Sequence, residues 1–191
     1  MTARTRVAAF FLFAGAVFLT ACVNQASKLP DYGQVPAFQM TDSAGHNFKR
    51  AMLNGKVWVA DFIYTNCPAA CPRMTAQMHK LEKQVHSMKD VELVSFSVDP
   101  NRDTPPVLDE FAHRFGGPTD RWVFLTGSPA TVHLIAYTTF HVGDVIGKID
   151  HSTKFILVDK SGRIRGYYSS FDRDDLSKLL TDVETLRDGQ S

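Results

Sequence analysis

Residues 37–191 alternate between two hydrophobic patterns, and these predict interleaved strands and helices. Short runs rich in Val, Ile and aromatic residues predict strands at 56–64, 91–98, 121–125, 155–158 and 163–168. Apolar positions spaced by three or four residues predict helices at 70–88, 104–115, 128–140 and 172–186. An alternating stretch with a turn signal predicts a hairpin over 37–48, whereas 142–149 is ambiguous and could form a short hairpin.

The order of these elements predicts an α/β domain. Strands that alternate with helices indicate a parallel sheet covered by helices, and the last two strands, joined by a turn at 160–162, add an antiparallel pair. We expect a thioredoxin-like fold, with a central mixed sheet flanked by helices and an N-terminal hairpin. A flavodoxin-type doubly wound sheet is the alternative, but no glycine-rich phosphate loop follows the first central strand.

The chain begins with the pattern of an export signal. Arg4 and Arg6 precede an uncharged apolar run, 7–19, which is shorter than the about 20 residues of a membrane span. The run ends in Leu-Thr-Ala-Cys, which resembles a bacterial lipoprotein cleavage site. We therefore expect a lipoprotein signal peptide at 1–21, lipidation of Cys22 and a flexible tether at 22–36. The domain 37–191 would then be exported, on the periplasmic side of the cell envelope, where copper can be handled.

The net charge and the cysteine count limit the classes of partner and of fold that the chain can have. The chain of 191 residues has a formal net charge of +1, so charge gives no general reason to expect a nucleic acid. Three cysteines are too few for a disulfide scaffold. Once Cys22 is assigned to the lipid, Cys67 and Cys71 remain as a pair in the domain.

Cys67 and Cys71 stand where the strand 56–64 passes into the helix 70–88. A helix N-terminus favours thiolate over thiol. An offset of four residues can bring both sulfurs to one side of a turn, close enough for a disulfide or one soft metal ion. A buried structural disulfide or two core thiols are the alternative, but loops at strand ends carry function more often than packing.

Several chemistries compete for this CxxxC pair. A thioredoxin-type oxidoreductase has CxxC, so efficient dithiol cycling is less expected here. A closed structural zinc site needs more than two cysteines. Two thiolates and one imidazole suit copper, because thiolate is soft enough for Cu(I) and imidazole also tolerates Cu(II).

A third ligand would come from the histidines. His79, His86, His113 and His133 fall on predicted helices and are interpreted as wholly or partly exposed, and His46 lies in the hairpin turn. His141 and His151 remain. Because His151 lies in a loop that enters the strand 155–158, its position favours it over His141, without excluding the latter.

Met74 and Met78 are soft ligands too, but their helical spacing indicates core. Trp58 and Trp122 are core or face a partner.

Three segments together resemble the Sco/SenC family of thioredoxin-fold copper chaperones, which help to build the copper centres of cytochrome c oxidase. They are YTNCPAACP at 64–72, SVDPNRDTP at 97–105 and HSTKFILVD at 151–159. The similarity extends from about Gly33 to Leu186, in the order and spacing of the family.

The resemblance implies a site and a partner. Cys67, Cys71 and His151 would be the copper ligands, and the two cysteines could also form a disulfide. The recipient would be the dinuclear copper (CuA) subunit of cytochrome c oxidase. Asp99 matches the family's Asp-Pro motif, and either supports the site from outside the ligand set or caps a turn. The family often has an acidic residue between the cysteines, where this chain has Ala69 and Ala70.

The competing hypothesis is an enzyme, so whether the chain is one stays open. In a thiol–disulfide reductase that keeps the recipient's cysteines reduced, Cys67 would attack, Cys71 would resolve and His151 would be dispensable. A peroxiredoxin-like peroxidase is weaker, because the expected Pro-x-x-x-Thr-x-x-Cys surround is absent, although Thr65 lies two residues before Cys67.

Overall fold

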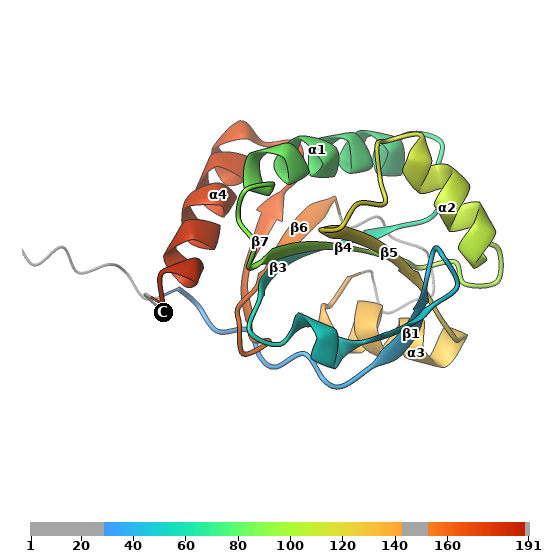
Figure 1. Ribbon diagram of the computed structural model, residues 1–191, viewed down its shortest axis with the longest axis horizontal. Helices are drawn as coiled ribbons and strands as arrows, with labels where there is room; N and C mark the ends of the chain where they lie inside the picture. Colours follow the sequence, from blue (N-terminus) through green and yellow to red (C-terminus); the bar gives the residue numbers. More distant parts are fainter. Residues whose placement is uncertain (1–28, 143–152, 190–191) are drawn as a thin grey trace, which may run out of the picture.

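The computed structural model describes residues 29–142 and 153–189 (Figure 1). The strands are β1 Gln39–Asp42, β2 Asn47–Lys49, β3 Val57–Ile63, β4 Val91–Ser97, β5 Trp122–Thr126, β6 Lys154–Val158 and β7 Ile164–Ser169. The α-helices are α1 Ala70–Val85, α2 Pro105–His113, α3 Pro129–His133 and α4 Arg173–Arg187. A 3₁₀ turn, η1 Arg50–Leu53, follows β2, and a π-helical turn, η2 Leu134–Thr139, continues α3.

These strands form one sheet in the order β2-β1-β5-β4-β3-β6-β7. The three central strands, β3, β4 and β5, are parallel. Strand β6 pairs antiparallel with β3, β7 with β6, and the β1–β2 hairpin adds antiparallel strands at the other edge. The predicted mixed sheet flanked by helices, with an N-terminal hairpin, is therefore confirmed.

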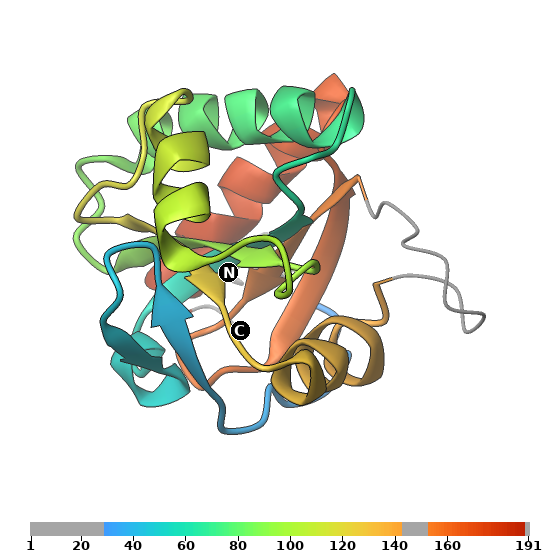
Figure 2. The ribbon, with the colours of Figure 1, turned by 90° about the vertical axis from the view of Figure 1, so that its right-hand side faces the viewer.

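Helices cover both faces of the sheet (Figures 1 and 2). Helices α1, α2 and α4 lie on one face, where a stripe of apolar residues on α1 packs on residues of the central strands; this stripe consists of Met74, Met78, Leu81 and Val85. Both Met74 and Met78 are buried, as the helical spacing predicts. Helix α3 and η2 lie on the opposite face, over a second apolar cluster. Trp58 and Trp122 are fully buried, one in each cluster.

Two local predictions need correction. The helix expected at 128–140 starts as an α-helix, with the Ser128 hydroxyl accepting the N–H of Thr131, but widens into η2. The wider turn lets Phe140 share the buried side of Ile135, so both pack against the sheet. His79, predicted on the solvated side of its helix, is only partly exposed: its ring stacks on Trp122 at 6.3 Å between centroids, and its Nδ1 is buried.

The start of the folded domain also differs from expectation. The tether predicted to reach residue 36 is packed on the protein from Leu29 onward, because its backbone pairs with the free edge of β7. Tyr32 donates its N–H to the Ile164 carbonyl, and Val35 donates to that of Gly162, both at 2.9 Å. Any tether therefore ends before Leu29.

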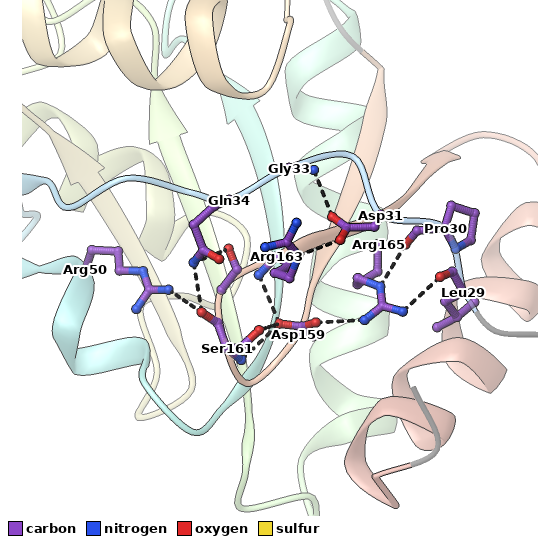
Figure 3. A network of polar contacts seen from close by, with 11 residues as sticks. Leu29, Pro30, Asp31, Gly33, Gln34, Arg50, Asp159, Ser161, Arg163 and Arg165 are labelled. Carbon is purple, nitrogen blue, oxygen red and sulfur yellow. Dashed lines mark hydrogen bonds and ion pairs between the residues drawn. The ribbon is translucent and has the colours of Figure 1, made fainter.

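Side chains reinforce this N-terminal segment (Figure 3). The Arg165 guanidinium donates to the carbonyls of Leu29 and Pro30 and pairs with Asp159 at 2.9 Å. Arg163 pairs with Asp31 at 2.6 Å in a more exposed position.

Among the described helices, none is both long and apolar enough to cross a membrane.

Candidate metal centre

The two cysteines lie at the carboxyl end of β3, in the loop that leads into α1. Both are free thiols, and both are buried, with exposed fractions of 6% for Cys67 and 2% for Cys71. Their predicted position at a strand-to-helix passage is confirmed. The loop that follows β4 begins beside them, because β3 and β4 run parallel and finish at the same edge of the sheet.

The Cys67 sulfur occupies the place of a helix cap. Helix α1 begins at Ala70, and Ala69 at its N-cap position has no side chain that could accept a hydrogen bond. Instead, the backbone N–H of Cys71 donates to the Cys67 Sγ at 3.2 Å. The N–H of Cys67 donates to the Tyr64 carbonyl, also at 3.2 Å. The start of the helix therefore presents positive dipoles to this sulfur.

These contacts make Cys67 the more acidic thiol. Burial alone would raise its pKa, but hydrogen bonds from the backbone and thiol of Cys71, the N–H of Ala69 and the Tyr64 hydroxyl hold the pKa below its ordinary value. The same arrangement affects Tyr64: burial, and then its hydrogen bond to Cys67, raise the pKa of the phenol to about 12. At neutral pH Tyr64 therefore stays a donor.

Cys71 has the opposite character. Burial, followed by the nearby Cys67 and Asp61, raises the pKa of this thiol to about 12. Asp61 lies on β3 in register with Ser95 and is itself fully buried. Burial raises the pKa of Asp61 to about 7; Ser95 lowers it only in part, and neither carboxyl oxygen has a partner in hydrogen-bond geometry within the described structure.

A second carboxylate, Asp103, joins the two loops beside the cysteines. It is fully buried and accepts three hydrogen bonds: from the Thr65 N–H at 3.1 Å, the Thr65 hydroxyl at 2.5 Å and the Ser97 hydroxyl at 2.6 Å. Ser97 in turn accepts the N–H of Asp99 at 3.1 Å. The carboxylate of Asp99 pairs with Arg102 at 3.4 Å and is partly exposed.

The proposed third ligand and the lipidation site, His151 and Cys22, lie outside the described residues. The ambiguous stretch 142–149 falls there too, apart from Val142. His141 is described: it is exposed and has a positive φ of 51°. Within the described part of the chain, no group of three His, Cys, Asp or Glu side chains is arranged to hold a metal ion.

The site also contains groups that the sequence reasoning did not select. Tyr64 and Asp103 both stand within motifs already recognised, yet their contacts depend on how two loops meet. Asp61 did give a signal, as a charged residue inside an otherwise apolar strand. Two buried free thiols, one with a lowered pKa and one with a raised pKa, suit either a soft metal ion or reversible disulfide formation.

Comparison with known proteins agrees with this arrangement. The family model described as SCO1/SenC matches residues 27–187. The SCO1 protein homolog of Bacillus subtilis (strain 168) is 35% identical over 177 residues, which cover 88% of this chain and 91% of that protein.

Solved structures of the family share the fold. A SCO1/SenC family lipoprotein of Bacillus anthracis has a TM-score of 0.72 at 37% identity, covering 80% of this chain and 94% of its own. BsSco, described as having a disulfide switch and as a member of the Sco family of cytochrome c oxidase assembly proteins, has a TM-score of 0.73 at 33% identity, covering 83% and 95%. Yeast Sco1 with copper bound has a TM-score of 0.65 at 25% identity, covering 83% and 94%.

The thioredoxin-like fold is thereby confirmed, since its mixed sheet and flanking helices match those structures over most of their length. The family model spans most of the chain, including the CxxxC loop and the loop after β4. The chain belongs to the SCO1/SenC family.

Proposed function

We propose that this protein binds copper through Cys67, Cys71 and His151 and delivers it to the CuA site of cytochrome c oxidase. The observation that carries the proposal is the pair of free thiols at the end of β3, one of them held with a lowered pKa by the start of α1. Relatives described as oxidase assembly proteins, and one solved with copper bound, support it.

The donor set fits copper as a cargo. Thiolates are soft ligands that select Cu(I), and an imidazole allows Cu(II) as well. Binding requires both thiols to lose their protons, so copper affinity should fall as the pH falls. With three ligands from this chain, the metal would keep an open coordination position, where a ligand of the recipient can begin a stepwise exchange.

The proposed place of action follows from the N-terminus. Lipidation of Cys22 would anchor the domain to a membrane on the periplasmic side, and the relative from Bacillus anthracis described as a lipoprotein supports this. Since the folded domain begins at Leu29 or earlier, only a few residues would separate it from the anchor. A short tether would keep the site near membrane-bound recipients.

The difference in pKa between the thiols favours a second candidate function, thiol–disulfide reduction. The Cys67 thiolate would attack a disulfide of the recipient and form a mixed disulfide, releasing one recipient thiolate. Cys71 would then lose its proton, attack the Cys67 sulfur and release the second thiolate. The pair ends as a disulfide and the recipient's cysteines end reduced. The disulfide switch described for BsSco supports this chemistry.

One experiment separates the two functions. The copper-free CuA domain of an oxidase is offered to the protein in two states, with its cysteines reduced or as a disulfide. The copper-loaded wild type should transfer metal to the reduced domain. His151→Ala should fail to load copper yet still reduce the disulfide, while His113→Ala, an exposed residue of α2, should behave like the wild type. Failure of the loaded wild type to transfer copper, or normal loading by His151→Ala, would contradict the proposal.

A further inference from the structure

The loop that carries Cys67 is held by hydrogen bonds to a carboxylate, Asp103, that is not among the proposed copper ligands. The strand β3 ends at Ile63, and the chain must then turn before α1 begins at Ala70. Within this turn Thr65 donates both its N–H and its hydroxyl to the carboxylate of Asp103. Thr65 is only two residues from Cys67, so this contact restrains the backbone directly before the cysteine.

Asp103 is placed to act on two loops at once. Its Oδ2 accepts from the Thr65 N–H and from the Ser97 hydroxyl, and its Oδ1 accepts from the Thr65 hydroxyl. Its own N–H donates to the Asp99 carbonyl at 2.8 Å. Because the side chain is completely buried, water cannot take the place of the carboxylate as acceptor if it is removed, and the Thr65 and Ser97 donors would be left unpaired.

We propose that Asp103 is a positioning residue for Cys67: it holds the turn at Thr65 so that the Cys67 sulfur stays at the start of α1, in the geometry of the reduced pair. It thereby sets the balance between dithiol and disulfide. If the proposed copper function is correct, it also sets the affinity for copper.

The direction of the effect follows from the geometry. The structure contains the dithiol, in which Cys67 Sγ accepts the N–H of Cys71. A turn that is no longer fixed by Asp103 loses part of this stabilisation of the reduced form, whereas a covalent disulfide holds its own geometry. Removal of the carboxylate should therefore shift the equilibrium toward the disulfide, which makes the midpoint potential more negative.

The test compares Asp103→Ala with a matched change elsewhere. Asp159→Ala removes a buried carboxylate that also accepts several hydrogen bonds, including those of Ser161 and Arg165 (Figure 3). The midpoint potential is measured without copper, in buffers of defined thiol–disulfide ratio, together with the melting temperature. We expect Asp103→Ala to favour the disulfide about tenfold, or about 30 mV. Asp159→Ala should lower the melting temperature and leave the potential unchanged.

Two milder variants keep the test decisive if Asp103→Ala does not fold. Asp103→Asn can still accept the Thr65 N–H and offer its amide to the Thr65 hydroxyl, so it should restore most of the wild-type potential. Thr65→Val removes one of the three hydrogen bonds and should move the potential in the same direction as Asp103→Ala, by less. A wild-type potential in Thr65→Val together with a lower melting temperature would assign Asp103 a purely structural role.

The copper arm uses a Cu(I) chelator in competition with the protein. Asp103→Ala or, if needed, Thr65→Val should bind Cu(I) more weakly than the wild type, with Asp159→Ala unchanged. If the wild type binds no copper but the potential still shifts in these variants, the positioning role stands and the proposed copper function fails. If the potential does not shift, the positioning role fails, whatever the copper result.

Discussion

Cys67 and Cys71 are one helical turn apart, yet their thiols ionise at different pH because their surroundings differ. The sulfur of Cys67 receives hydrogen bonds from the start of α1 and from Tyr64, which lower its pKa against the effect of burial. The sulfur of Cys71 lies deeper, near Asp61, and its pKa is raised to about 12. At the residue scale, the pair thus consists of one thiol that loses its proton more easily than an ordinary cysteine and one that loses it less easily.

Replacement of Tyr64 by Phe tests the first half of this statement. The variant keeps the ring and removes the hydroxyl that donates to Cys67, so the pKa of Cys67 should rise. Alkylation of the reduced protein by iodoacetamide should slow about threefold or more at neutral pH, with its pH profile moved to higher pH. Tyr167→Phe, remote on β7, serves as the control. An unchanged profile in Tyr64→Phe would show that the hydroxyl does not stabilise the thiolate.

Asp61 gives a prediction about stability and pH. Its pKa is about 7 in the folded protein and near 4 in the unfolded chain, so between these values the folded state binds more protons. Stability should therefore fall as the pH rises from about 4 to about 7 and stay constant above. The penalty at pH 8 is on the order of 4 kcal/mol.

Asp61→Asn should remove this penalty. Urea denaturation at several pH values should find the variant more stable than the wild type at pH 8, with the difference vanishing toward pH 4. Asp90→Asn should have the opposite effect and be less stable than the wild type at pH 8. The reason is that hydrogen bonds from Arg187 and Lys160 outweigh burial and lower the pKa of Asp90. A constant difference between Asp61→Asn and wild type at all pH values would contradict the assignment.

At the scale of elements, the sheet would have a free edge at β7 without the segment that precedes β1. Residues from Leu29 to Val35 cover this edge, and the Arg165 guanidinium joins the segment to the β6–β7 turn. Arg165 and Asp159 are both buried, whereas Arg163 and Asp31 are about half exposed. The two ion pairs should therefore differ in their contribution to the free energy of unfolding.

Removal of each arginine measures that difference. Arg165→Ala leaves the Asp159 carboxylate buried without its guanidinium partner and should cost about 3–5 kcal/mol of unfolding free energy. Arg163→Ala should cost less than about 1 kcal/mol, because its pair is exposed to solvent. Chemical denaturation of both variants checks this, and equal losses would mean that burial does not govern these pairs.

Hydrophobic patterning was sufficient to predict nearly all the helices and strands, since the central strands are buried along almost their whole length and the longer helices bury one side. It failed where tertiary contacts decide. The π-helical turn at 134–139 depends on where Phe140 finds room against the sheet. The N-terminal segment has no period of its own and is ordered by the edge of β7. His79 is off the stripe of α1, but packs on Trp122 from β5.

At the scale of the whole molecule, the fold brings two loops together at one edge of the parallel strands. The CxxxC pair could be predicted from sequence, because it lies within one short segment. The roles of Asp61 and Asp103 could not, because each depends on a neighbour from another strand or loop, Ser95 and Thr65 respectively. The family resemblance supplied the proposed third ligand, His151, which its position in the sequence favoured over His141 without excluding the latter.

The central claim is that this domain holds one copper ion with two thiolates and one imidazole. The most direct test is the copper content of the reduced, tag-free protein after loading and removal of free metal, for the wild type, the Cys67→Ser/Cys71→Ser double variant and His151→Ala. We predict one copper per wild-type chain and no stably bound copper in either variant. A wild type without copper, or a His151→Ala variant that retains one copper per chain with the wild-type affinity, would contradict the account.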